Sequence, residues 1–270
     1  MSKGPDSAPT PDALMAQLAF FASPLADFNT SKPARKRTIS VYHGTSKEGF
    51  YGLLPYVLPD DNNSNGVPFY TCVYQKSQIL RSENASTTFS LPGAIEAICG
   101  TANDGLKAEA IVNSQDSVSV QLAGQSLEGS RLLLQVAPDS SSAPTFHTTA
   151  TKFITPEDTW QIEAPTTFKL GPKIDPIFIG YAMQSPKDKR RKVPLVICQA
   201  VPGNIYTLHR PRGWIVAFWE SKGEISTGQI VDISTLMKSD PIIFESDGTS
   251  NASVYHGPGP NQFEVEYGEA

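Results

Sequence analysis

The feature that most limits the fold of this chain is a succession of short apolar or alternating segments that begins near residue 37. Segments of this length, bounded by turn-forming residues, are typical of β-strands. Clusters of Pro, Gly, Asn, Asp and Ser separate them, and the chain has 22 prolines and 20 glycines for such turns. The clearest segments are TISVYH, SVSVQLAG, SRLLLQVA, DPIFIGYAM, VPLVICQAV and GWIVAFWES. The pattern predicts a mainly β protein.

A few short helices are expected beside these strands, so the predicted fold class is α+β with a large excess of β. Residues 47–58 (KEGFYGLLPYVL) and 91–100 (LPGAIEAICG) are interpreted as short helical stretches, the second ending at Gly100 as a C-cap. Residues 11–21 (PDALMAQLAFF) place apolar side chains at helical spacing after a proline that suits a first helical position.

Composition divides the chain into an arm and a body. Residues 1–37 are predicted to form a flexible N-terminal arm that contains the short helix and a basic linker at 29–37 (NTSKPARKR). Residues 38–270 are predicted to form a single β-rich globular domain, a size that one domain can reach. A second basic cluster, KDKRRK at 187–192, is expected in a solvated loop, although either cluster could contact an acidic partner.

Charge and cysteine content exclude several classes of protein. The net charge of −5 argues against a protein that covers its whole surface with nucleic acid, and does not exclude a local contact through a basic arm. Three scattered cysteines without a CxxC pair predict neither a metal cluster nor a disulfide framework, so a cytoplasmic or other intracellular location is expected. No run of eighteen apolar residues occurs, so no membrane span is expected.

Four motifs with residues suited to nucleotide chemistry follow one another along the chain. The first is Tyr42-His43-Gly44-Thr45, at the end of an apolar strand-like run. The second, at 65–79, contains both Phe69-Tyr70 and Lys76-Ser77, and the third is Gly203-Asn204-Ile205-Tyr206. The last is the closing segment NQFEVEY, which contains Gln262 and Glu264. In this order the motifs resemble those of the ADP-ribosyltransferase superfamily, in particular its poly(ADP-ribose)-polymerase-like branch.

The resemblance implies an enzyme that binds NAD as a substrate and transfers ADP-ribose to a protein or nucleic-acid acceptor. By this resemblance His43, with Gly44 and Thr45, would bind the nicotinamide ribose, and Tyr70 would stack on the nicotinamide ring. Ser77 would take the family's Lys-Ser position in the cofactor site. Either Glu264 or Gln262 would be the catalytic residue, because a carboxylate at this place stabilises an oxocarbenium ion.

The same resemblance predicts a split sheet in which TISVYHGT and NQFEVEY lie close together. His43 and the 262/264/266 face of the closing strand should then open on a common cleft. Because more than a hundred residues separate Ser77 from Pro194, residues 80–190 are predicted to form a β-rich inserted lobe. A second Tyr-His-Gly, which includes His256, is expected in the turn before the closing strand.

The competing hypothesis is a non-enzymatic structural subunit, such as a viral coat protein or another self-assembling β-rich protein. Many short strands with Thr/Ser/Pro-rich loops suit a β-sandwich or jelly roll. The arm and its basic linker would suit a homo-oligomer whose subunits reach a neighbour or a nucleic acid. On this hypothesis the protein would be located in a virion.

Overall fold

The architecture comes from a computed structural model, which describes residues 37–58, 66–91, 93–103, 105–124, 128–137, 142–148, 156–171, 174–221, 223–244, 250–259 and 262–268. The helix predicted at 11–21 and nearly all of the basic linker lie outside the described residues. Within them the chain forms eighteen β-strands and one short 3-10 helix, η1 (Ile233–Thr235). The prediction of a mainly β protein is therefore confirmed.

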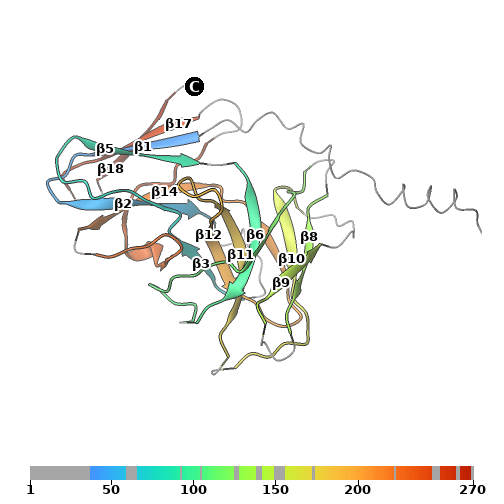
Figure 1. The fold of residues 1–270 in the computed structure, drawn as a ribbon. Coiled ribbons are helices and arrows are strands. Elements are labelled where there is room, and N and C mark those ends of the chain that lie inside the picture. Colours follow the sequence, from blue (N-terminus) through green and yellow to red (C-terminus); the bar gives the residue numbers. More distant parts are fainter. Residues whose placement is uncertain are drawn as a thin grey trace, which may run out of the picture. The chain divides into compact units, whose positions relative to one another are not determined.

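Sheets A and B each have four strands (Figure 1). Sheet A contains the first and last motifs, and sheet B contains Lys76. Sheet A has the order β18-β17-β1-β5. Its strands are β18 (Phe263–Gly268), β17 (Asn251–His256), β1 (Arg37–His43) and β5 (Ala85–Leu91). Sheet B has the order β16-β14-β2-β4. Its strands are β16 (Met237–Lys238), β14 (Gly213–Glu220), β2 (Gly49–Tyr56) and β4 (Gln75–Lys76).

Sheets C and D are built from the middle of the chain and from β3, β13 and β15. Sheet C joins β13 (Ile205–His209), β10 (Thr159–Glu163), β8 (Arg131–Gln135) and β9 (Thr145–Thr148) in that order. Sheet D has the order β15-β3-β12-β11-β6-β7. Its strands are β15 (Ile230–Val231), β3 (Phe69–Cys72), β12 (Lys192–Gln199), β11 (Ile177–Gln184), β6 (Ile95–Thr101) and β7 (Asp116–Ser119).

The helices expected at 47–58 and 91–100 are wrong, because both segments are strands. Seven of the eight positions of β2 are buried, since Phe50 and Leu54 pack into one apolar cluster while Tyr51 and Leu53 pack into another. A strand buried on both faces is apolar at consecutive positions and loses the period-two alternation that identifies half-buried strands. β6 follows the same rule, and Gly100 lies inside it rather than at a helix end.

The largest apolar cluster receives side chains from all four sheets. Ile39 comes from sheet A, Trp214 from sheet B, Trp160 from sheet C and Tyr181 from sheet D, and each of them is buried. Residues 35–270 accordingly form one compact unit.

Residues 80–190 do not form a lobe of their own among the described residues. Their strand β5 pairs with β1 in sheet A. Strands β6, β7 and β11 belong to sheet D, and β8, β9 and β10 belong to sheet C together with β13. The segment predicted as an insertion therefore contributes strands to three of the four sheets. Its strands pair with strands that precede it in the sequence, such as β1, and with strands that follow it, such as β12 and β13.

Candidate functional site at the paired Tyr-His-Gly segments

The Tyr-His-Gly repeat extends to five identical residues, SVYHG, at Ser40–Gly44 and Ser253–Gly257. Strands β1 and β17 contain these residues, run parallel and pair in register from serine to histidine. The Gly44 N–H donates to the His256 carbonyl oxygen (2.8 Å) and extends the pairing beyond the strand. Each residue of one segment thus lies beside its identical counterpart in the other. His256 is the last residue of β17, so the expectation that it lies in the turn before the closing strand is wrong.

The two histidines point to the inner face of sheet A and meet a tyrosine from sheet B. His43 is 1% exposed and His256 is 3% exposed. The Tyr51 hydroxyl oxygen lies 2.8 Å from the Nδ1 atom of each imidazole ring. The His256 ring also stacks on Phe263, with ring centroids 4.3 Å apart and planes 3° apart. The contacts join sheets A and B through one hydroxyl group.

Counting protons limits the roles of these three groups at neutral pH. A tyrosine hydroxyl has one proton, so Tyr51 can donate to only one imidazole and must accept from the other. The arrangement in which Tyr51 also uses its own proton within the cluster gives the two histidines opposite tautomers, one protonated at Nδ1 and the other at Nε2. His43 Nε2 is buried and has no hydrogen-bond partner in the described part of the chain.

Burial keeps this cluster uncharged. Desolvation is the main cause that lowers the pKa of His43, and it lowers the pKa of His256 to about 4, with smaller contributions from His43 and Lys47. Desolvation also raises the pKa of Tyr51 well above its usual value. The Tyr51 hydroxyl and the two imidazole rings thus form a neutral, buried and hydrogen-bonded cluster. Such a cluster is suited to holding sheets A and B together, and it is poorly suited to transferring protons to a bound substrate.

The outer face of the same strands is different in character. Tyr42 and Tyr255 are 39% and 40% exposed, and their rings stack with centroids 4.9 Å apart and planes 12° apart. Glu264 pairs with Tyr255 across β17 and β18, and Glu266 pairs with Ser253 one row along. Desolvation raises the pKa of Tyr255, with a further contribution from the carboxylate of Glu266.

Hydroxyl groups dominate the rest of this face. Strand alternation places one set of side chains outward across sheet A, and the set contains two carboxylates, two tyrosines and no Lys, Arg or His. We call these side chains the outer face of sheet A: Thr38, Ser40, Tyr42, Ser86, Thr88, Ser90, Asn251, Ser253, Tyr255, Glu264 and Glu266.

Four of the predicted cofactor-binding residues lie around Tyr51. His43 contacts its hydroxyl group, and Gly44 follows directly. Thr45 is buried, and its hydroxyl oxygen accepts a hydrogen bond from the Lys47 N–H. The Ser77 hydroxyl oxygen accepts from the Tyr51 N–H (2.9 Å). Of these residues His43 and Thr45 are buried, Ser77 is half-buried and Gly44 is exposed.

The remaining predicted residues are placed elsewhere. Tyr70 lies in β3 of sheet D and packs against a separate apolar cluster. Gln262 closes the turn between β17 and β18, where its side-chain oxygen accepts from the Gly259 N–H (3.1 Å). Glu264 lies on the outer face of sheet A, whereas His43 lies on the inner face. The prediction that His43 and Glu264 open on a common cleft is therefore wrong, although β1 and β18 do belong to one sheet.

Two residues of the site, Tyr51 and Tyr255, were not found by sequence reasoning. Tyr51 was assigned to a helix, which hid its place in a strand opposite the histidines. Tyr255 belongs to the repeat, and comparing five residues rather than three would have suggested that β1 and β17 are neighbours.

Other features of the described residues leave the paired segments as the best candidate. No group of three or more His, Cys, Asp or Glu side chains there could hold a metal ion. A shallow pocket lined by Lys169, Ile174, Asp175 and Gln199, among others, contains none of the predicted cofactor-binding residues. No helix in the described part of the chain is long and apolar enough to cross a membrane.

Comparison with known proteins finds no matching family model, no similar curated protein and no similar solved structure. The functional conclusion therefore rests on the geometry alone.

Proposed function

We propose that this chain is a non-enzymatic structural subunit that self-assembles, and that the outer face of sheet A receives the basic segment 32–36 of a neighbouring copy. The observation that carries this proposal is the exposed Tyr42–Tyr255 stack beside Glu264 and Glu266. Two stacked tyrosines next to two carboxylates, on a face that is otherwise made of hydroxyl and amide groups, form a receptor for a cationic side chain.

Charge complementarity identifies the occupant. Segment 32–36 (KPARK) contains three cations and no carboxylate. An arginine guanidinium group stacks on an aromatic face and pairs with a carboxylate through two N–H groups. The exposed Tyr255 ring and the neighbouring Glu264 offer both contacts to one arginine, for which Arg35 is suited.

Geometry favours a segment from a second copy over the chain's own segment. Segment 32–36 directly precedes Arg37 at the beginning of β1, whereas Tyr42 lies five residues further along the same strand. Five residues of strand span about 17 Å, so the chain's own segment would have to reverse direction to reach the stack. A segment from a neighbour can approach the face from either end.

The energy of one such contact is small. An exposed cation–π contact contributes about 0.5–1 kcal/mol and an exposed ion pair about 0–1 kcal/mol. Assembly through this contact is therefore expected to depend on concentration and to weaken in high salt, because salt screens exposed charges.

The test is the sedimentation of the full chain over a wide concentration range at low and high salt. We expect oligomers at low salt that dissociate as salt rises. Glu264→Gln/Glu266→Gln in the face, or Arg35→Gln/Lys36→Gln in the segment, should each shift the protein to monomers. The exposed Glu157 and Glu224 lie outside sheet A, so Glu157→Gln/Glu224→Gln is the matched control for the face variant and should sediment like wild type.

Mixing the two variants separates exchange between copies from folding back within one copy. Arg35→Gln/Lys36→Gln keeps the wild-type outer face of sheet A, and Glu264→Gln/Glu266→Gln keeps the wild-type segment 32–36. The mixture should therefore form heterodimers only if the contact joins two copies. A wild-type protein that stays monomeric at every concentration would refute self-assembly.

NAD-dependent ADP-ribose transfer is the second candidate function, and the grouping of His43, Gly44, Thr45 and Ser77 around Tyr51 favours it. It is supported less well because the His43 ring is buried and hydrogen-bonded to Tyr51. Each candidate function goes with one of the two finer fold hypotheses. The enzyme would have the split sheet of the ADP-ribosyltransferases, and the structural subunit would have a β-sandwich or jelly roll.

Thermal melting with NAD tests the second candidate. A ligand that binds only the folded state adds about 2.7 kcal/mol of stability at a hundredfold excess over its Kd. A rise in Tm with NAD that His43→Ala abolishes would establish the NAD site. If Tm does not rise with NAD and the chain self-assembles, the result supports the structural subunit.

A further inference from the structure

The turn between β11 and β12 of sheet D concentrates positive charge in an otherwise acidic protein. Residues 187–191 read KDKRR, four cations and one carboxylate, while the whole chain has a net charge of −5. All five side chains are exposed. We call residues 185–191 the basic turn.

Hydrogen bonds fix the backbone of the basic turn. The Ser185 N–H donates to the Arg191 carbonyl oxygen (2.9 Å), and the Arg191 N–H donates to the Asp188 carbonyl oxygen (3.0 Å). The Ser185 hydroxyl oxygen accepts from the N–H groups of Lys187 and Asp188, both at 3.3 Å. A backbone held by this many bonds presents its side chains from a fixed base.

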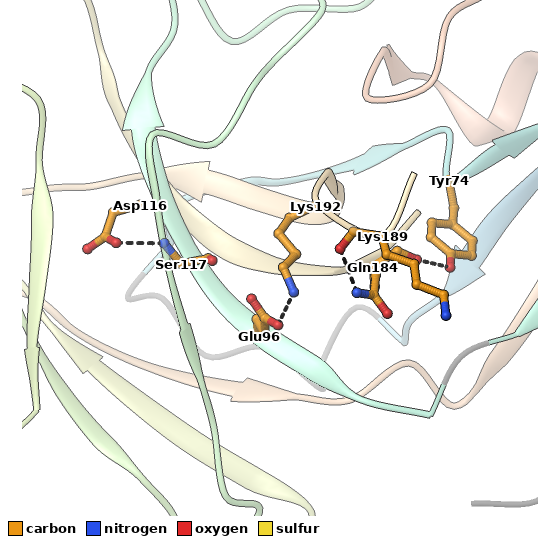
Figure 2. Close-up of polar contacts among 7 residues, drawn as sticks. All are labelled: Tyr74, Glu96, Asp116, Ser117, Gln184, Lys189 and Lys192. Atoms are coloured by element: carbon orange, nitrogen blue, oxygen red, sulfur yellow. Dashed lines mark hydrogen bonds and ion pairs between the residues drawn. The ribbon is translucent and has the colours of Figure 1, made fainter. Parts of the chain in front are cut away.

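The neighbouring strands anchor this base (Figure 2). The Gln184 side-chain amide donates to the Lys189 carbonyl oxygen (2.6 Å), and the hydroxyl of buried Tyr74 donates to the Gln184 carbonyl oxygen (2.8 Å). The Arg191 guanidinium donates to the Thr227 carbonyl oxygen (3.3 Å). The basic turn is thus tied to sheet D and to the loop before β15.

The cations of the basic turn differ in whether a carboxylate neutralises them. Lys192, directly after the turn, forms an ion pair with Glu96, as Figure 2 shows. Lys187, Lys189 and Arg190 have no carboxylate partner in the described part of the chain. The one acid within the turn, Asp188, uses its Oδ1 atom to accept from the Arg190 backbone N–H (2.9 Å). Three exposed cations on a fixed backbone are therefore available to a ligand.

We propose that the basic turn binds the phosphate backbone of a nucleic acid, with Lys187, Lys189 and Arg190 each contacting a phosphate group. Electrostatic attraction to phosphates supplies essentially all of the free energy of non-specific nucleic-acid binding. Stable attachment to a membrane needs a second, apolar or lipid anchor, and the basic turn contains no large apolar side chain. The turn provides what nucleic-acid binding requires and lacks what membrane binding requires. This inference does not depend on self-assembly.

The experiment is a titration of a fluorescently labelled single-stranded oligouridylate with the full chain, followed by anisotropy at several salt concentrations. The variant Lys187→Gln/Lys189→Gln/Arg190→Gln removes three cations from exposed positions. It should bind several-fold more weakly. The slope of log K against log salt should become less steep by about 2, because each phosphate contact to a single strand contributes roughly 0.7 to that slope.

A charge-matched variant separates a site from a general effect of net charge. Lys107→Gln/Lys169→Gln/Lys238→Gln removes three cations elsewhere, none of them in an ion pair among the described residues, and should leave both affinity and slope near wild type. Equal losses in the two triple variants would overturn the proposal, as would an unchanged titration of the turn variant. Thermal melting of each variant confirms that it is folded.

The second part of the experiment measures binding of the wild type and of the turn variant to vesicles of phosphatidylserine and phosphatidylcholine. If the turn variant lost binding to these vesicles and kept its binding to the oligonucleotide, the basic turn would be a membrane contact, and the nucleic-acid proposal would be wrong.

Discussion

Replacing Tyr51 by phenylalanine tests the central feature of the site, a single hydroxyl shared by two buried histidines. The change keeps the ring, which is fully buried between sheets A and B, and removes only the oxygen atom. Both imidazole Nδ1 atoms then lose the partner that lies 2.8 Å away. At roughly 1–3 kcal/mol for each buried polar group left without a partner, we expect a loss of about 2–6 kcal/mol in the free energy of unfolding.

Tyr74→Phe is the matched control. The Tyr74 ring is also buried, but its hydroxyl donates to the Gln184 carbonyl oxygen and is not shared by two buried imidazole rings. Its loss should cost about 1 kcal/mol. The two variants therefore differ in the number of polar groups left unsatisfied and hardly at all in apolar volume.

The assay is chemical denaturation at neutral pH, with thermal melting as a second measurement. For a chain of this size about 2–4 °C of Tm corresponds to 1 kcal/mol, so Tyr51→Phe should lower Tm by roughly 4–24 °C. Long-range proton–nitrogen spectra of the histidine rings should show opposite tautomers for His43 and His256 in the wild type. If Tyr51→Phe costs no more than Tyr74→Phe, or if both rings carry their proton on Nε2, so that Tyr51 can bond to only one of them, the shared-hydroxyl account is refuted.

Three further predictions follow from the same region and from the core. Because the folded-state pKa of His256 is about 4 and the unfolded value is about 6.5, its stabilising contribution is complete above pH 6.5 and is lost as pH falls toward 4. Denaturation series should show that His256→Gln flattens this dependence by up to about 3 kcal/mol, whereas His147→Gln, at an exposed position of β9, leaves it unchanged. Gly44→Ala places a Cβ atom 2.8 Å from the His256 carbonyl oxygen and should cost about 1–3 kcal/mol in denaturation, whereas Gly124→Ala, with no atom within 4 Å of its Cβ, should be nearly neutral. The three cysteines are buried and burial raises the pKa of each thiol, so Ellman's reagent should react with them only after unfolding; rapid reaction of the native protein would contradict this.

The sequence by itself determined the β-rich class and many of the strand positions. The alternating segment TISVYH lies on β1 and the first half of SVSVQL lies on β7, and apolar residues separated by turn-forming residues leave few other solutions. It also contained the SVYHG repeat, from which a neighbouring arrangement of β1 and β17 could have been inferred. The repeat did not predict that the two segments run parallel, because that depends on how the chain between them is routed.

Only the tertiary structure decided which segments are buried on both faces and which side chains share a face. Strands β2 and β6 resemble helices in sequence because neighbouring sheets cover both of their sides and remove the alternation. His43 and Glu264 belong to one sheet but to opposite faces, since strand register fixes the direction of every side chain and a shift of one residue reverses it. Register between residues 213 positions apart, as for Thr38 and Asn251, comes from packing of the whole core, which no local segment of the sequence specifies.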